Sequence, residues 1–158
     1  MMNRATSATQ SGVGLIEVLV AVLVLSIAFL GIAALQAMSM STNNSAMARS
    51  MATIDSYSIL DAMRADIASA KGSSLPYNTA SPLKGNACPA VGATLATAQL
   101  NQWCTQLGHD LGATASTTGT ISCATSGECT VTITFDDSRA GVGAASATNQ
   151  TVITKAIL

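Results

Sequence analysis

The stretch Gly12-Val13-Gly14-Leu15-Ile16-Glu17 stands directly before an apolar stretch, Val18 to Leu35, and this junction decides the fold. With residues 36–40 the run reaches the length of about 20 residues that a membrane-spanning helix needs. No ionisable side chain occurs between Glu17 and Arg49. A carboxylate at the edge of hydrocarbon is costly unless a partner neutralises it, which makes Glu17 a candidate functional residue.

Residues 1–12 form a short polar leader with one basic side chain, Arg4, and the leader ends at Gly12. Cleavage after Gly12 would place a new ammonium group on Val13, four residues before Glu17. Loss of Arg4 would reduce the seven basic side chains of the chain to six, against eight acidic ones. A chain with this balance and no clustered basic face is not expected to bind nucleic acid.

The length of 158 residues leaves room for one small domain after the leader and the membrane segment. Only 9% of the residues are charged and 49% are hydrophobic, with few aromatic rings. We therefore expect four segments. These are a leader at 1–12, a membrane-spanning half of a helix at 13–40, a second helical half at 41–70 and a globular head at 71–158.

A single long helix is predicted from the cleavage site to about Ser69, because no proline occurs at 13–75 and Gly31 is the only glycine at 15–71. The weakest helical stretch is 41–45. The second half carries an apolar face that should pack on a sheet, with charged flanks. The face is Leu60, Met63, Ile67 and Ala70, and the flanks are Asp55, Asp61, Arg64 and Asp66.

The head begins with a connector rich in proline, glycine and asparagine at 71–92, which we do not expect to enter the core. A short helix is predicted from Ala93 to Leu107, with Thr94 as N-cap, Trp103 as a core anchor and Gly108 as its end. Two strands with period-two alternation follow at 119–123 and 130–135, and 150–158 is a third candidate strand. The apolar stripe of the short helix is Leu95, Leu100, Trp103 and Leu107. The expected fold class is α+β, with the long helix packed on a small antiparallel sheet.

Four cysteines, Cys88, Cys104, Cys123 and Cys129, all lie beyond the apolar run. An even number in an exported domain indicates two disulfides, for which three connectivities exist. A bridge between Cys123 and Cys129 across a hairpin is the simplest choice, which leaves Cys88 and Cys104 as the other pair. A zinc site is less favoured, because no two cysteines form a close pair and His109 has no partner histidine.

The N-terminal motif resembles that of the type IV prepilins and pseudopilins. In this family a glycine precedes Phe or Met and then Thr-Leu-Ile-Glu, so Gly12, Leu15, Ile16 and Glu17 match. Val13 and Gly14 depart from the pattern, which bears on N-methylation rather than on cleavage. The resemblance continues through 17–21, 30–36 and 63–65.

The resemblance implies a type IV pilin-like fold and a minor pilin. A prepilin peptidase would remove 1–12 and methylate Val13, leaving a subunit in the inner membrane with its head in the periplasm. The Glu17 carboxylate would then neutralise the Val13 ammonium of a neighbouring subunit during assembly, with Leu15 and Ile16 beside it. The expected partners are the peptidase, other minor pilins and the major pilin, and the subunit would end in the pilus at the cell surface.

Other interpretations remain open. A minor pseudopilin of a type II secretion system would share the N-terminal chemistry. A signal peptide cleaved after Ala37 would instead release a periplasmic binding domain, although the apolar run is longer than the usual stretch of about 7 to 15 residues. Glu17 could also be only a helix-start acid favoured by the macrodipole.

An enzyme is not expected, and neither a cofactor nor a metal is. His109 and Asp110 fall at the end of the short predicted helix, where a solvated pair is the simpler interpretation. Asp136 and Asp137 lack the further spaced oxygens of a calcium loop and are expected at a hairpin corner. No glycine-rich phosphate loop or nucleophile elbow is present in the sequence.

Overall fold

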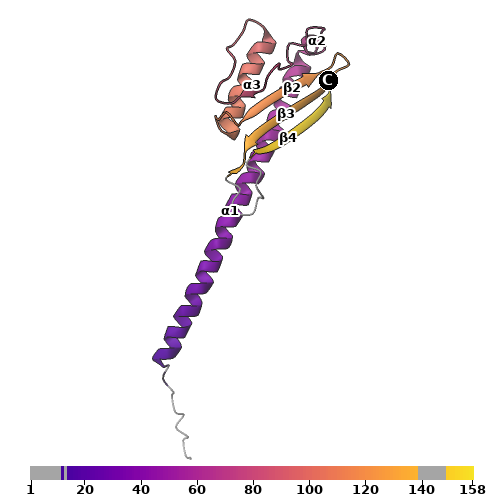
Figure 1. Ribbon diagram of the computed structural model, residues 1–158. Coiled ribbons are helices and arrows are strands. Elements are labelled where there is room, and N and C mark those ends of the chain that lie inside the picture. The colour runs from indigo at the N-terminus through magenta and orange to yellow at the C-terminus, as the bar shows by residue number, and fades with distance from the viewer. Residues whose placement is uncertain (1–11, 13, 139–148) are drawn as a thin grey trace, which may run out of the picture. The chain divides into compact units, whose positions relative to one another are not determined.

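The computed structural model describes residues 12, 14–138 and 149–158 (Figure 1). The chain divides into two compact units, Met1–Ser39 and Met40–Leu158. Helix α1, Leu15–Ala65, begins in the first unit and ends in the second. The second unit also contains the remaining helices and a four-stranded antiparallel sheet, so the α+β class is confirmed.

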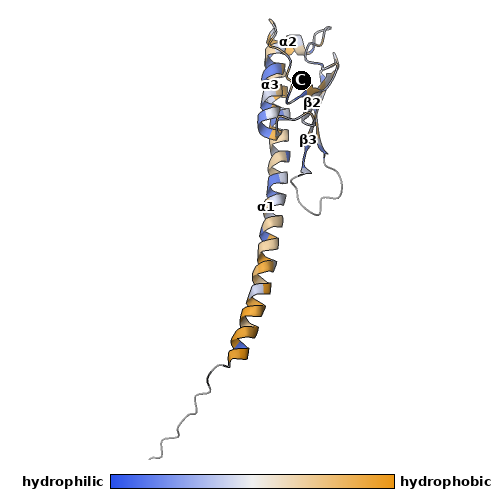
Figure 2. Ribbon diagram, turned by 60° about the vertical axis from the view of Figure 1, so that its left-hand side comes forward, coloured by the Kyte–Doolittle hydropathy of each residue, from blue (hydrophilic) through white to orange (hydrophobic). Residues whose placement is uncertain are grey.

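In the first unit, the large apolar side chains of α1 are exposed. The orange colour of this part of α1 in Figure 2 shows that the segment is strongly hydrophobic. One described helix is long and apolar enough to cross a membrane, and it is α1. Apolar side chains left in water at this density are unfavourable, so a lipid or protein environment is the physical expectation for this segment.

The second part of α1 ends one turn earlier than the sequence predicted. The residues at 41–45, expected to be the weakest stretch, are helical. Asp66 then leaves the helical conformation, with φ −119° and ψ 47°, before the short helix α2, Ile67–Ala70. The Asp66 carboxylate accepts hydrogen bonds from Ser69 Oγ at 2.8 Å and from Tyr77 Oη at 3.0 Å. The break turns Ile67 toward solvent, so its predicted place on the buried face was wrong.

Helix α3, Leu95–Leu111, is capped as predicted but ends later. The Thr94 hydroxyl accepts a hydrogen bond from the Thr97 amide at 3.3 Å. The helix runs through Gly108 and stops at Gly112, whose φ of +102° favours glycine. Gly108 serves a different purpose, because a Cβ there would lie 2.5 Å from the carbonyl oxygen of Gly85.

The sheet contains β1 (Leu83–Lys84), β2 (Thr118–Cys123), β3 (Glu128–Asp136) and β4 (Asn149–Ile157), in that spatial order. The three predicted strands are confirmed within one or two residues at each end, whereas β1 was not predicted. It is only two residues long and pairs with the start of β2. Figure 1 shows the strands crossing the second part of α1, with α3 beside them.

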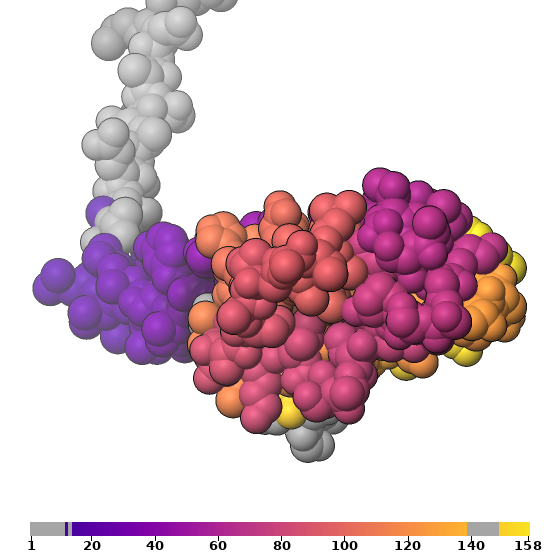
Figure 3. Space-filling model, turned by 90° about the horizontal axis from the view of Figure 1, so that it is seen from above, coloured from indigo at the N-terminus to yellow at the C-terminus, as the bar shows by residue number. Residues whose placement is uncertain are grey.

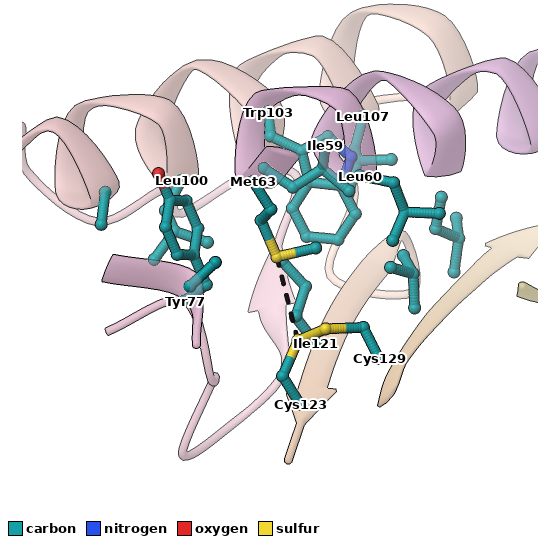
Figure 4. Close-up of a cluster of buried hydrophobic side chains, with 14 of the residues drawn as sticks. Ile59, Leu60, Met63, Tyr77, Leu100, Trp103, Leu107, Ile121, Cys123 and Cys129 are labelled. Atoms are coloured by element: carbon teal, nitrogen blue, oxygen red, sulfur yellow. Dashed lines mark hydrogen bonds between the residues drawn. A yellow bond between two sulfur atoms is a disulfide. The ribbon is translucent and has the colours of Figure 1, made fainter. Parts of the chain in front are cut away.

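The core of the second unit lies between the inner face of the sheet and the two helices (Figure 4). Every second residue of β2 and β3 points inward, as period two requires. The main contributors are Ile59, Leu60 and Met63 of α1, Trp103 and Leu107 of α3, and Ile121, Val131, Ile133 and Phe135 of the sheet. Leu95 is exposed, so its place on the α3 stripe was wrong.

The connector is more than a surface loop, because its Tyr77 is fully buried in the core. Asn78 binds the β2 backbone through both ends of its amide, donating to the Cys123 carbonyl at 3.0 Å and accepting from the Cys123 amide at 2.6 Å. The Tyr77 hydroxyl also contacts Gln99 of α3. Figure 3 shows that the connector and α3 together form most of one face of this unit.

Two disulfides join Cys88 to Cys104 and Cys123 to Cys129, the pairing that hairpin geometry favoured. Cys123 and Cys129 are opposite residues of β2 and β3. Their bridge faces the core, where Cys123 Sγ lies 3.9 Å from Met63 Sδ (Figure 4). The other bridge ties the connector to α3 and places Cys104 Sγ 3.3 Å from the Lys84 carbonyl oxygen.

Candidate processing and assembly site

The candidate site is the first turn of α1 and the residues just before it. The Gly14 carbonyl accepts hydrogen bonds from the amides of Glu17 at 2.9 Å and Val18 at 3.3 Å, which closes the first turn. Glu17 therefore stands in the first turn, where the helix macrodipole favours a negative charge. Val13 and the leader residues 1–11 lie outside the described residues.

Leu15 and Ile16 in this turn are largely exposed, at 86% and 71%. A Cβ on Gly14 would meet only Ile16 Cγ2, at 3.9 Å, and one on Gly12 would meet nothing within 4 Å. Neither glycine is therefore required by packing in the described part of the chain.

Glu17 makes no ion pair within the described residues. The sequence places its next ionisable neighbour toward the C-terminus at Arg49. Along α1 this is a separation of 32 positions, or about 48 Å at the usual helical rise.

The remaining candidate residues lie apart from this turn, in the second unit. His109 Nδ1 lies 2.7 Å from Asp110 Oδ1, and the His109 ring is mostly exposed. Asp136 Oδ1 accepts a hydrogen bond from the Ser138 amide at 2.8 Å, and Asp137 Oδ2 accepts one from Ser45 Oγ at 2.5 Å. The Asp136 carboxylate therefore binds the backbone of the turn after β3, and the Asp137 carboxylate joins this turn to α1.

Some of these residues line a hollow of about 390 Å³ on the second unit. Its wall contains Met47 and Met51 of α1, His109 and Asp110 of α3, and Asp136 and Asp137. Among the described residues, no group of three or more His, Cys, Asp or Glu side chains is arranged to hold a metal ion.

Comparison with models of known protein families, with curated proteins and with solved structures found no match.

Sequence reasoning missed one residue of chemical interest, Asp55. It was placed on a solvated flank of α1, but its side chain is fully buried. The spacing could have identified it, because Asp55 precedes Ile59 and Met63 at steps of four and so shares their buried face. Asp61 and Arg64 do lie on the exposed flank, where they form an ion pair at 2.7 Å.

Proposed function

We propose that the chain is a minor type IV pilin. It is processed by a prepilin peptidase between Gly12 and Val13, held in the inner membrane by α1 and assembled with other minor pilins and the major pilin. The observation that carries this proposal is Glu17 in the first turn of a helix that has no other ionisable side chain before Arg49. The proposal is supported by a resemblance of the N-terminal sequence to the minor pilins known as type IV pilus modification proteins.

The chemistry of assembly follows from the exposed apolar surface of the first part of α1. This surface dissolves in lipid, and in a filament it would be buried against the helices of other subunits. Moving from one apolar environment to the other costs little solvation free energy. The Glu17 carboxylate is the exception, because it needs a cation when it leaves the membrane edge.

The new ammonium on Val13 would supply that cation, on a neighbouring subunit. A buried charge left without its partner typically costs about 3–5 kcal/mol, so the pair would select one axial register between helices. A filament subunit needs such a selection because an apolar surface alone allows many registers. The two disulfides suit a head that works in an oxidising compartment.

Glu17→Ala tests the assembly role, and Glu128→Ala is its matched control because Glu128 is the other glutamate of the chain and is exposed on β3. We expect both variants to be cleaved and inserted into the membrane. Only Glu128→Ala should be recovered in sheared pili, measured by immunoblot against the membrane fraction. Normal recovery of Glu17→Ala in pili would contradict the proposal.

Processing is tested separately by intact mass and N-terminal sequencing of protein from host membranes, with and without the peptidase. We expect a mature chain that starts at Val13 only when the peptidase is present. A start near Met38 would instead indicate ordinary signal-peptide cleavage and a released periplasmic domain.

A further inference from the structure

The sheet of the second unit has two edges, and the chain closes only the edge at β1 and β2. β1 is two residues long, and beyond it the connector satisfies outer backbone groups of β2. The Thr79 amide donates to the Ile121 carbonyl at 3.0 Å, and Thr79 Oγ1 accepts from the Ile121 amide at 3.0 Å. The Asn78 side chain binds both backbone groups of Cys123 in the same way. This edge is therefore occupied by the chain itself.

The opposite edge, the outer side of β4, has no such cover among the described residues. The Leu158 amide donates to the Gly127 carbonyl at 2.9 Å, which continues the register of β3 and β4. Because bonded and non-bonded pairs alternate along an antiparallel ladder, the even-numbered residues of β4 bind β3. The odd-numbered residues direct their backbone N–H and C=O groups outward, and these are Asn149, Thr151, Ile153, Lys155 and Ile157. None of these outward groups has a hydrogen-bond partner in the described part of the chain.

Exposed apolar side chains of the sheet are concentrated on the same strand. Among the described residues of the sheet, the large apolar side chains that are exposed are Ile153, at 60%, and Ile157, at 72%. The outer faces of β2 and β3 carry threonine, serine and acidic side chains instead. On the inner face, Val152 and Ala156 are only half-buried, whereas the inward residues of β2 and β3 are buried. The core therefore lacks cover where β4 ends the sheet.

The β4 edge also lacks most of the features that protect natural edge strands, which are proline, a bulge, several charges or a short length. β4 has nine residues in an unbroken register with β3, contains no proline and carries one charge, Lys155. At about 3.4 Å per residue, the strand presents about 30 Å of unpaired backbone. Such an edge is a template for one more strand.

Antiparallel pairing with a second copy of the chain does not fit this edge while both copies stay in one membrane. Such pairing would relate the copies by a two-fold axis perpendicular to the sheet, which reverses every direction in the sheet plane. Within the second unit, α1 and β4 run in the same general direction (Figure 1), so the two α1 helices would run in opposite directions. The occupant is therefore a different polypeptide, and this step rests on the membrane anchoring proposed above.

We propose that the outer edge of β4 binds an extended segment of another polypeptide, which joins the four-stranded sheet as an additional antiparallel strand. The outward backbone groups would form about ten main-chain hydrogen bonds, two for each opposed pair. β-Branched apolar side chains of the segment would lie beside Ile153 and Ile157 on the outer face and beside Val152 and Ala156 on the inner face. An acidic side chain would lie beside Lys155. The partner segment is thus a largely apolar strand with one acidic residue.

Amide hydrogen exchange of the full chain in a non-ionic detergent, read by NMR, tests whether the edge is free. The amides of Val152 and Thr154 should exchange slowly because they bind β3, and those of Thr151 and Ile153 should exchange rapidly. Slow exchange at all four positions before any peptide is added would overturn the proposal, because the edge would already be covered.

The probe for the partner is the synthetic peptide acetyl-Val-Val-Glu-Thr-Val-Val-Thr-Thr-Ser-amide, whose glutamate would lie opposite Lys155. Its control is the same peptide with proline at the fifth position, which removes a central N–H that would bind β4. We expect the first peptide to slow exchange at Thr151 and Ile153 by about tenfold and to leave Val152 and Thr154 unchanged. The proline peptide should change none of the four. Equal effects of the two peptides, or no effect of either, would contradict strand addition.

Ile153→Pro blocks the edge from the protein's side. Proline is tolerated on an edge strand where the missing N–H faces outward, so the ladder to β3 should remain. Ile153→Val is the matched control, because it keeps both the N–H and a β-branched apolar side chain. We expect Ile153→Pro to weaken peptide binding by about tenfold and Ile153→Val by about twofold at most.

Light scattering of the full chain in detergent distinguishes the other occupant. We expect no dimer that depends on this edge, and a dimer that Ile153→Pro abolishes would assign the edge to a second copy and overturn the proposal. Equal peptide binding by Ile153→Pro and Ile153→Val would overturn it as well. These readouts use the isolated chain, so a failure of pilus assembly and a failure of strand addition are separate results.

Discussion

Replacing Gly108 by alanine gives opposite expectations from local sequence and from the fold. In a helix interior, glycine to alanine usually stabilises by up to about 1 kcal/mol. In this structure the new Cβ would lie 2.5 Å from the Gly85 carbonyl oxygen, whereas ordinary contacts begin at 3.4 Å. The obstacle is backbone, so it cannot move away as the end of a flexible side chain would.

The Cys88–Cys104 disulfide makes this close contact harder to relax. Cys104 lies one turn before Gly108 on α3, and the bridge joins that turn to the connector that contains Gly85. Overpacking of a well-packed contact typically costs about 1–3 kcal/mol. After the propensity gain is subtracted, we expect Gly108→Ala to destabilise the second unit by about 1–2 kcal/mol.

Thermal unfolding of the full chain in detergent, followed by circular dichroism under oxidising conditions, measures this cost. A domain of this size loses about 4 °C in Tm per kcal/mol, so we expect a decrease of about 4–8 °C. Gly31→Ala is the matched control, because a Cβ at Gly31 meets nothing within 4 Å, and it should leave this transition unchanged. A Gly108→Ala chain as stable as the wild type would refute the reasoning.

Four further predictions concern the second unit. Gly119→Ala would place the new Cβ 2.5 Å from the buried Trp103 indole. We expect this substitution to lower the free energy of unfolding, measured by urea titration, by about 1–3 kcal/mol. An unchanged free energy of unfolding would show that the indole moves aside. Thr94→Ala removes the N-cap of α3 and should cost about 1 kcal/mol in the same assay, with Thr94→Ser as a control that keeps the hydroxyl. Replacing both Cys88 and Cys104 by serine opens a loop with a sequence separation of 16 and should lower the free energy of unfolding by about 3 kcal/mol. Equal urea midpoints for the wild type and this variant would contradict the loop-entropy argument. Because folding raises the pKa of Asp55 from 3.8 to about 6, its neutral carboxyl stabilises the fold fully below about pH 4, and this contribution of about 3 kcal/mol is lost as the pH rises through 6. Calorimetry from pH 4 to pH 8 checks this sign, and a Tm that rises with pH because of Asp55 would exclude it.

Much of the fold follows from local patterns that the sequence displays directly. The apolar run after Glu17 predicts a long helix, period-two alternation predicts β2 and β3, and β4 was a third candidate strand. The disulfide between Cys123 and Cys129 follows from a hairpin whose two ends lie close in the chain. These features depend on neighbours within a few residues, which is the range over which helical and strand periodicity act.

The sequence prediction was less accurate wherever a contact joined distant segments. The break at Asp66 accompanies its hydrogen bond to Tyr77, and that bond also explains how a connector residue enters the core. Burial, with the Asp66 carboxylate as a further cause, raises the pKa of Tyr77 well above its usual range. Neither the helix break at Asp66 nor the burial of Tyr77 can be inferred from the local composition of residues 71–92.

By itself, then, the sequence determined the apolar helix with its first-turn Glu17, the three main strands and the α+β class. Each of these features depends on the spacing of residues that are neighbours in the chain. Only the tertiary structure decided that Gly108 lies within α3 against Gly85, and that the Asp55 side chain is fully buried. The physical reason is the same in both cases. Close approach and desolvation depend on which segments meet in space, and that is set by the packing of the whole second unit.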